Sequence, residues 1–152
     1  MTDRFLVDTN ILVYIYDRSE PAKQKMAEAL YDRLMLSGRG VISTQIMAEF
    51  FNASTRRLSQ PLPPDFAYRR LENYQRSWDV VSVTPSIVLE AARGVIDHQL
   101  NFWDSLIWAT AKLNQISVIL SEDFRSDTSL EGIRFINPLS DNFDLDLWFG
   151  ED

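Results

Sequence analysis

Two acidic residues follow short apolar runs that predict buried strands. Asp8 comes directly after FLV, and Asp123 lies in SEDF, just beyond the run VIL. Parallel strands bring their carboxyl ends to one edge of a sheet, where binding crevices form, so we expect both carboxylates at that edge. Each acid also has a simpler explanation, because DTN can cap a helix and acids are common in turns.

Two further acids lie on expected helices, beside apolar residues. Glu49 borders an apolar stripe that includes Ile46, although its stem can pack there while its head reaches water. Asp104 lies on the same helical face as Trp108, where an unpaired carboxylate is costly. Its simpler explanation is a cap for a helix that begins at Ser105. All four acids can converge on one crevice.

Four carboxylates in one crevice would need a compensating charge. Each pair at 4 Å repels by about 1 kcal/mol in water and about 4 kcal/mol at an effective dielectric near 20. The sequence has no cysteine and one histidine, His98, which excludes thiolate sites and most histidine metal sites. Mg²⁺ or Mn²⁺ prefers carboxylate and water oxygens, activates water and offsets phosphodiester charge. The acids therefore predict metal-dependent phosphodiester hydrolysis.

The elements that must position these acids alternate between strand and helix. Short apolar runs predict five strands, at residues 5–7, 41–43, 80–83, 118–120 and 133–136. Helical patterns lie between them, over residues 21–38, 44–57, 65–77, 85–98 and 102–114. We expect Ser19, Asp65 and Thr84 to cap three of these helices. This alternation predicts an α/β fold, with helices on both faces of a parallel sheet.

The length and charge of the chain limit its class. Its 152 residues predict one domain, over residues 1–152, and the net charge of -7 argues against a broad basic surface for nucleic acid. The apolar segment at residues 11–16 is too short to cross a bilayer and no basic leader precedes it, so we expect a soluble, cytoplasmic protein. The acidic carboxyl-terminal segment DNFDLDLWFGED is expected to be peripheral.

A few basic and aromatic residues keep contact with nucleic acid open. Five arginines lie on two adjacent expected helices and either contact phosphates or form a solvated surface: Arg56, Arg57, Arg69, Arg70 and Arg76. Trp103 and Trp108 flank Asp104 and either stack on bases or belong to the core, as aromatic residues on helices more often do. His98 is expected to be structural or exposed.

The acidic motifs resemble, in order and spacing, those of PIN-domain nucleases. The motifs are LVDTN, AEF, FWDSLIWATA and ILSEDF, and the likeness extends to the segment IRFINPL. It is greatest for the toxin ribonucleases of VapBC-type toxin–antitoxin modules. The resemblance implies a three-layer α/β/α fold, in which a central, mostly parallel five-stranded sheet lies between helical layers. The alternation of elements predicts the same architecture independently.

The resemblance also assigns the site. It implies a cofactor, Mg²⁺ or Mn²⁺, that is bound by four catalytic acids: Asp8, Glu49, Asp104 and Asp123. Asn10 and Ser121 match positions where the family places small polar residues, which would orient water or an acid. Glu122 is also acidic, so the choice of Asp123 at the second strand end stays open.

The activity that the resemblance implies is hydrolysis of RNA by a metal-dependent endoribonuclease. Such a protein would be the toxin of a type II toxin–antitoxin module, a homodimer that a small antitoxin inhibits. An expected docking place for the antitoxin is the helical pair beside PLPP, with Phe50, Phe51, Phe66 and Tyr68. Two alternatives are a non-catalytic PIN-like interaction domain and a PIN-type nuclease for another nucleic acid. A haloacid-dehalogenase-type phosphatase is less favoured, because DTN lacks the second Asp of its Asp-x-Asp motif.

Overall fold

A single twisted sheet runs through the middle of the computed structural model, which describes residues 3–124 and 127–150. Its strand order is β3-β2-β1-β4-β6-β5, and every pair is parallel except β5 with β6. The strands are β1 (Phe5–Val7), β2 (Gly40–Ser43), β3 (Asp79–Val81), β4 (Val118–Leu120), β5 (Thr128–Leu130) and β6 (Ile133–Ile136). The parallel core of the sheet confirms the expected α/β class.

The sheet has six strands where the sequence predicts five. The additional strand, β5, pairs antiparallel with β6 at the edge of the sheet. Its sequence, TSL, contains one apolar residue and none of its side chains is fully buried, so it lacks the pattern of a core strand. The short connection to β6 uses two residues with positive φ, Glu131 and Gly132. An edge strand of this kind depends on its partner more than on its own sequence.

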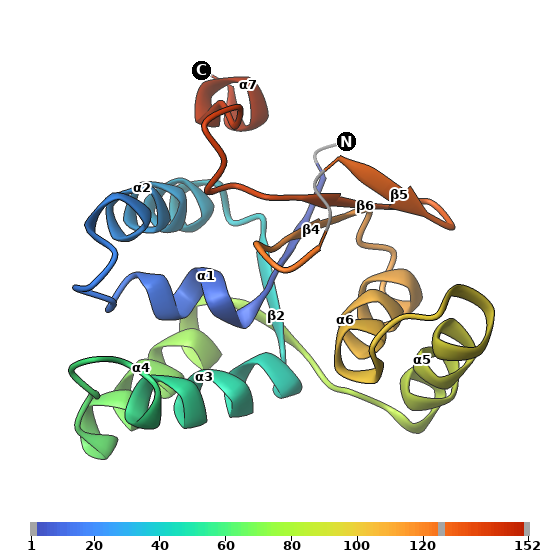
Figure 1. Ribbon diagram of the computed structural model, residues 1–152, viewed down its shortest axis with the longest axis horizontal. Coiled ribbons are helices and arrows are strands. Elements are labelled where there is room, and N and C mark those ends of the chain that lie inside the picture. Colours follow the sequence, from blue (N-terminus) through green and yellow to red (C-terminus); the bar gives the residue numbers. More distant parts are fainter. Residues whose placement is uncertain (1–2, 125–126, 151–152) are drawn as a thin grey trace.

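Helices cover both sides of the sheet, as the sequence predicts. Figure 1 shows α2 on one side and the pair α5 and α6 on the other, with α1 and α3 packed beside each other. The helices are α1 (Thr9–Tyr14), α2 (Pro21–Ser37), α3 (Thr44–Arg56), α4 (Pro64–Ser77), α5 (Pro85–His98), α6 (Phe102–Leu113) and α7 (Leu145–Phe149). Within the described ranges, none of these helices is both long and apolar enough to span a membrane.

One of the three expected helix caps is present. Thr84 accepts a hydrogen bond from the Ile87 amide, and Pro85 occupies the first turn of α5. The prediction for Ser19 is wrong, because its hydroxyl bonds to Asp17 instead of a free amide of α2. The prediction for Asp65 is also wrong. That residue lies inside the first turn of α4, which begins one residue earlier than expected.

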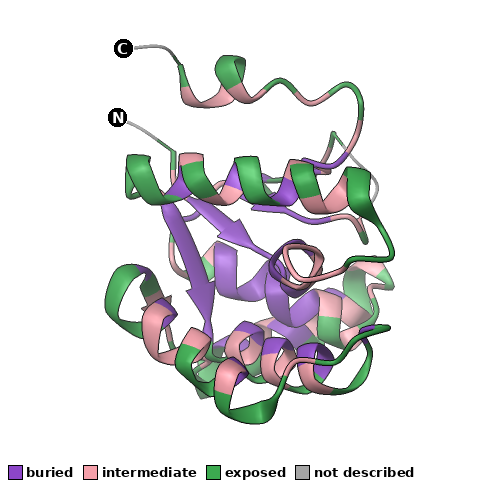
Figure 2. Cartoon of the chain, turned by 90° about the vertical axis from the view of Figure 1, so that its left-hand side faces the viewer, coloured by how far each residue is buried: buried purple, intermediate pink, exposed green. Residues whose placement is uncertain are grey.

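The core lies on both faces of the sheet, where the buried strands meet the inward sides of the helices (Figure 2). All three residues of β1 are fully buried, as is Trp108 of α6. Burying one large apolar side chain of this kind stabilises the fold by about 1.5–3 kcal/mol. The central strands are therefore rigid supports for whatever follows their carboxyl ends.

The carboxyl-terminal segment lies at the surface, with no fully buried side chain in its described residues 141–150, but two of its rings pack against the end of the sheet. The rings of Trp148 and Phe149 in α7 lie 6.0 Å and 5.2 Å from the ring of Phe5. The Arg39 guanidinium lies over the same Phe5 ring, 4.7 Å from its centroid. α7 therefore covers the amino-terminal end of β1, at the end of the strand away from Asp8.

The pair α5 and α6 packs unusually closely, and a glycine in the middle of α5 is the reason. A Cβ at Gly94 would lie 2.8 Å from the Trp108 ring and would also meet the Ser105 hydroxyl. That hydroxyl donates a hydrogen bond to the Ala91 carbonyl of α5, at 2.7 Å. Since Asp104 precedes Ser105 on α6, this contact fixes where the backbone of Asp104 lies.

Gly94→Ala tests the close contact between α5 and α6. Alanine is the better helix former by about 1 kcal/mol, so propensity alone predicts a more stable protein. We expect the opposite, a loss of about 1–3 kcal/mol in unfolding free energy, because the methyl group overpacks the Trp108 indole. Urea unfolding followed by circular dichroism measures the change. A variant more stable than the parent protein would contradict this description of the helix pair.

Candidate metal centre

The carboxyl ends of β1 and β4 bring two site residues together. The two strands are paired in parallel, with Val7 opposite Leu120, and the Asp8 amide continues the ladder to the Leu120 carbonyl at 2.9 Å. The residues that follow, Asp8 and Ser121, are therefore neighbours, although 113 positions separate them in sequence. The Ser121 hydroxyl donates to the Asp8 Oδ2 at 2.7 Å. The sequence predicts that both strands end at the same edge of the sheet, and the hydrogen bond between Ser121 and Asp8 lies at that edge.

The Ser121 hydroxyl connects three parts of the site. It accepts hydrogen bonds from the Asn10 amide group at 3.3 Å and from the Asp123 backbone amide at 3.1 Å. Because a hydroxyl has one proton and two lone pairs, these two donors leave its proton for Asp8. Asn10 also accepts from the Glu122 amide at 3.3 Å, which ties α1 to the segment after β4. Both small polar residues thus lie beside the acids, where the sequence places them.

Asp8 is both a helix cap and a buried acid. It precedes α1 and accepts a hydrogen bond from the Thr9 amide at 2.7 Å, so the capping explanation is confirmed, and it does not exclude a role in the site. Only 5% of Asp8 is exposed. Burial raises the pKa of its carboxyl to about 6, although the bonds from Ser121 and Thr9 oppose the rise, and the charges of Asp123 and Glu49 add to it.

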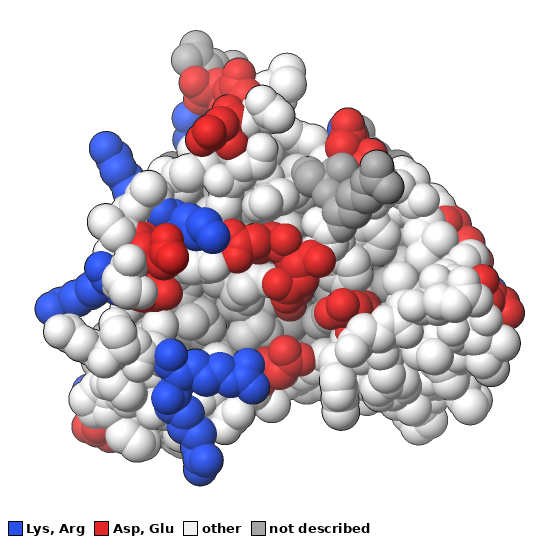
Figure 3. Space-filling view, viewed as in Figure 1, with Lys and Arg blue, Asp and Glu red and all other residues white. Residues whose placement is uncertain are grey.

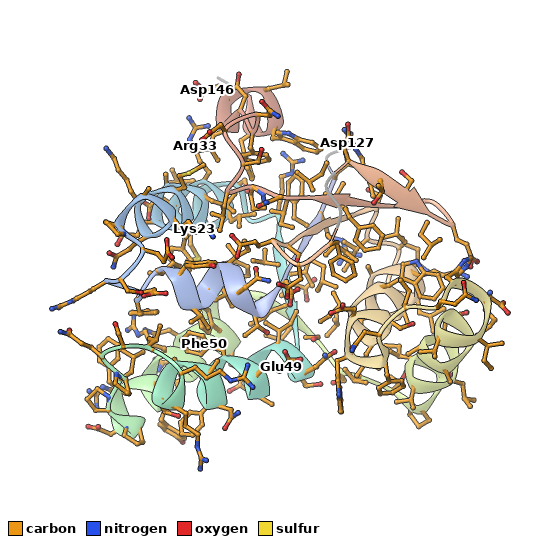
Figure 4. The ribbon with its side chains drawn as sticks, viewed as in Figure 1. Lys23, Arg33, Glu49, Phe50, Asp127 and Asp146 are labelled. Carbon is orange, nitrogen blue, oxygen red and sulfur yellow. The ribbon has the colours of Figure 1, made fainter. Side chains whose placement is uncertain are left out.

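Glu49 reaches the same region from α3. Figure 4 shows it on the side of α3 that faces α1, and the Thr9 hydroxyl lies 3.5 Å from its Oε2. Gln45, one turn earlier on α3, donates to the Oε1 at 2.5 Å. These contacts aim the carboxylate toward Asp8 instead of solvent. The role of Thr9 was not anticipated, although it lies inside the DTN motif.

Asp104 lies in the first turn of α6 and is half-buried. The hypothesis that it caps this helix is wrong, because the cap is Asn101, whose side chain accepts from the Trp103 amide at 2.9 Å. Burial is the main cause that raises the pKa of Asp104, and the charges of Asp123 and Glu49 raise it further. No described residue donates a hydrogen bond to its carboxylate.

Glu122 and Asp123 differ in what surrounds their side chains. The Glu122 carboxylate accepts from the Tyr14 hydroxyl at 2.5 Å and pairs with the Lys23 ammonium at 2.7 Å. Asp123 is exposed, lines the hollow beside Asp8 and forms no ion pair with a described residue. The neighbours of Glu122 already satisfy its charge, so the geometry favours Asp123 as the site acid at this strand end.

Three of the four acids, Asp8, Glu49 and Asp123, line a hollow of about 330 Å³ over α1 and α3, together with Asn10. Asp104 does not line this hollow, although its charge interacts with those of Glu49 and Asp123. Figure 3 shows acidic side chains gathered in the middle of this face, with basic side chains at the margin. The four acids come from four separate elements of the fold.

The carboxylates are suitable ligands for a hard divalent cation, but they lie too far apart here to coordinate one ion together. Carboxylates supply the oxygen ligands that Mg²⁺ and Mn²⁺ prefer. In the described part of the chain, no three acidic or histidine side chains already lie at the spacing of a metal shell. Repulsion between carboxylates favours such separation. A shared cation therefore requires Asp104 and Asp123 to turn toward Asp8 and Glu49.

The other candidate residues divide between structure and surface. Trp108 is fully buried and belongs to the core, whereas Trp103 is 62% exposed and does not. His98 is structural, since its ring contacts the Glu131 carboxylate and lies edge-on to Trp108. Of the five arginines considered in the sequence, Arg57 lines the hollow. It lies one residue past the end of α3, and the sequence alone does not distinguish it from the other four.

The four aromatic residues expected to dock a partner differ in burial, and two of them, Phe51 and Phe66, are half-buried. Phe50 is fully buried and stacks edge-on with Tyr74, 5.4 Å between centroids. Phe66 packs edge-on to Tyr16 at 6.0 Å. Tyr68 alone among the four expected residues is strongly exposed, at 60%.

Asp104→Asn tests the repulsion in metal-free protein. Because the pKa of Asp104 is raised in the folded protein, its carboxyl loses its proton at lower pH in the unfolded chain than in the folded one. The ionised Asp104 therefore destabilises the fold at pH values above the pKa of an aspartate in the unfolded chain, about 3.9. In chelator, we expect the variant to match the parent near pH 4 and to gain about 1 kcal/mol, a few degrees in Tm, at pH 7. Thermal unfolding at both pH values measures this gain. Asp32→Asn, at an exposed position on α2, is the matched control and gains nothing. An unchanged Tm for Asp104→Asn at pH 7 would count against the repulsion.

Comparison with known proteins identifies the fold family. A DNA-bound VapBC complex of Salmonella typhimurium superposes with a TM-score of 0.63 at 18% identity, over 89% of this chain and 97% of that chain. A sarcin-ricin-loop-cleaving toxin of Mycobacterium tuberculosis, VapC20, superposes with a TM-score of 0.60 at 17% identity, over 78% and 89%. A toxin–antitoxin complex of Klebsiella pneumoniae gives 0.61 at 17% identity, over 88% and 96%. Identities this low show a shared fold alone.

The sequence itself gives the family. Comparison with curated proteins finds no match. The family model described as PIN domain matches residues 5–128, which is most of the chain and includes all four acidic motifs. This protein therefore belongs to the PIN-domain family.

Proposed function

We propose that this protein is a Mg²⁺- or Mn²⁺-dependent endoribonuclease and the toxin of a type II toxin–antitoxin module. The observation that carries the proposal is that Asp8, Glu49 and Asp123 line one hollow, with the charge of Asp104 acting on two of them, and that none of the four has a basic partner. Within the described ranges, none of Asp8, Glu49, Asp104 or Asp123 forms an ion pair with lysine, arginine or histidine. Glu122, the residue before Asp123, pairs instead with Lys23.

A cation explains why these four acids lie near one another without basic partners. Leaving charges close together and unpaired costs stability, and a protein retains such a cost mainly at functional sites. Asp8, Glu49, Asp104 and Asp123 would hold the ion. When bound, the ion offsets the charge of a scissile phosphodiester and lowers the pKa of a water nucleophile.

The chain's own residues fix the acids before any substrate arrives. Ser121 and the Thr9 amide each hold one oxygen of Asp8, so its carboxylate is oriented. Gln45 and the Thr9 hydroxyl do the same for Glu49. In contrast, Asp104 and Asp123 keep uncommitted carboxylates that can turn toward a ligand. Half of the proposed shell is therefore preorganised and half is adjustable.

The overall negative charge is compatible with an RNA substrate. The site carboxylates account for part of the net charge of -7, and a bound cation would offset them. Arg56 is the last residue of α3, Arg57 after it lines the hollow, and in the described part of the chain neither guanidinium forms an ion pair. A local positive patch of this kind can contact phosphates without a basic surface elsewhere.

The proposed partners follow from the same reading. A small antitoxin would bind the protein and block the site, and the protein would act in the cytoplasm as a homodimer. The similarity to toxin–antitoxin complexes of Klebsiella pneumoniae and Salmonella typhimurium supports this choice within the family. RNA is preferred over DNA because VapC20, which has the same fold, is described as cleaving the sarcin-ricin loop.

Cleavage assays with two adjacent acids test the proposal. Purified protein is incubated with a panel of RNAs and single-stranded DNAs, in Mg²⁺ or Mn²⁺ and in chelator. We expect metal-dependent cleavage of RNA that Asp8→Asn, Asp104→Asn and Asp123→Asn each reduce by roughly 100-fold or more in kcat. Glu122→Gln is the matched control and should retain activity within about threefold, because its carboxylate is paired with Lys23.

Three outcomes would contradict the proposal. Cleavage that persists in chelator would exclude the cation, and equal losses in Glu122→Gln and Asp123→Asn would exclude the site assignment. Cleavage confined to DNA would replace RNA with the other nucleic acid as substrate. Circular dichroism of each variant establishes that it remains folded.

A further inference from the structure

A second hollow adjoins the acid-lined one along α3. It has a volume of about 730 Å³ and shares three wall residues with the first hollow, Glu49, Asn52 and Arg57. Its far side is formed by α6, where Trp103 and Leu106 line it. The two hollows are thus continuous past Glu49, and a chain that enters one can extend into the other.

Trp103 presents its indole at this second hollow. It is 62% exposed, whereas Trp108, five residues along the same helix, is fully buried. The Trp103 ring lies edge-on to Phe102, 5.2 Å between centroids, and its carbonyl accepts from the Gln45 side chain at 3.3 Å. These contacts hold the residue in place while leaving most of its ring in water. Asp104, the next residue, belongs to the acid site.

Arg57 stands at the junction of the two hollows with its charge uncommitted. Other arginines are engaged, as Arg69 is with Asp65 and Arg134 with Asp127. For Arg57, the described residues provide neither an ion pair nor a hydrogen bond to the guanidinium, although carboxylates line the same hollow. A free guanidinium that close to an anionic site is suited to a phosphate.

We propose that the second hollow binds the nucleotide next to the scissile phosphate of a single-stranded nucleic acid. The base of that nucleotide stacks on the Trp103 indole, and Arg57 contacts a backbone phosphate on the other side of the site carboxylates. This inference rests on the proposed nuclease function and names the substrate class that the same site takes. A paired base keeps its faces inside the duplex, so stacking on Trp103 selects unpaired strands.

The order of the groups supports this occupant. Trp103 lies beside Gln45 at the start of α3, Glu49 follows one turn later, and Arg57 lies just past the end of the helix, so the carboxylates lie between the indole and the guanidinium. A strand with its scissile phosphate at the cation can place a base on the indole on one side and a backbone phosphate against Arg57 on the other. An apolar side chain of a protein partner would use the indole but not Arg57.

An abasic scan distinguishes stacking on Trp103 from every other contribution. Fluorescein-labelled eight-nucleotide RNAs, each lacking one base at a different position, are titrated with parent protein and Trp103→Leu. Binding is followed by anisotropy in Ca²⁺, with gels to show that the RNA stays intact. We expect one abasic position to weaken binding to the parent protein at least about fivefold. The same position should have little effect on binding to Trp103→Leu, because the stacking partner is already gone.

Matched controls come from residues of the same type outside the hollows. Tyr68→Leu removes an aromatic ring that is 60% exposed on α4 and should keep the full abasic penalty. Arg57→Gln should weaken binding at all RNA positions and reduce its salt dependence, and Arg56→Gln, the adjacent residue, should do so less.

The inference and the nuclease proposal can fail separately. An abasic penalty that is equal in the parent protein and in Trp103→Leu would overturn the inference, even if metal-dependent cleavage is intact. Tighter binding of duplex RNA than of single strands would also overturn it. Loss of cleavage alone, with the abasic penalty and its dependence on Trp103 unchanged, would support the binding site and contradict the nuclease function.

Discussion

Repulsion among the four site carboxylates is the constraint on which the rest of the site depends. Asp8 is almost completely buried, and Glu49 and Asp123 add negative charge beside it. The fold tolerates this because Ser121 and the Thr9 amide hold the Asp8 oxygens, and because Asp104 and Asp123 keep room to separate. The cation that we propose would turn this cost into binding energy, since every acid that repels its neighbours would attract the ion.

Parallel pairing and close helix packing make the convergence possible. The register of β1 on β4 places Asp8 beside Ser121, and the single Ser121 hydroxyl then orients α1 and the segment that carries Asp123. On the other side, Gly94 lets α6 lie close to α5, which sets the position of Asp104. α7 closes the opposite end of β1 and leaves the carboxyl edge of the sheet open.

Features that depend on local pattern were predictable, and features that depend on distant partners were not. The alternation of apolar runs predicts the parallel core of the sheet, and the acids at strand ends predict one shared edge. β5 escapes prediction because it is an edge strand with a single apolar residue. The contrast between Glu122 and Asp123 depends on Lys23 and Tyr14, which lie about 100 residues earlier in the chain. Which tryptophan is buried depends likewise on where α5 packs.

Direct titration of metal-free protein with Mn²⁺, followed by calorimetry, tests the central claim that these carboxylates share a cation. We expect saturable binding at pH 7.5 that becomes about tenfold weaker at pH 5, because the ion must displace a proton from Asp8, whose pKa is about 6. Asp104→Asn should weaken binding at pH 7.5, and Asp32→Asn should not. Absence of saturable binding, or an affinity that is the same for both variants, would contradict the claim.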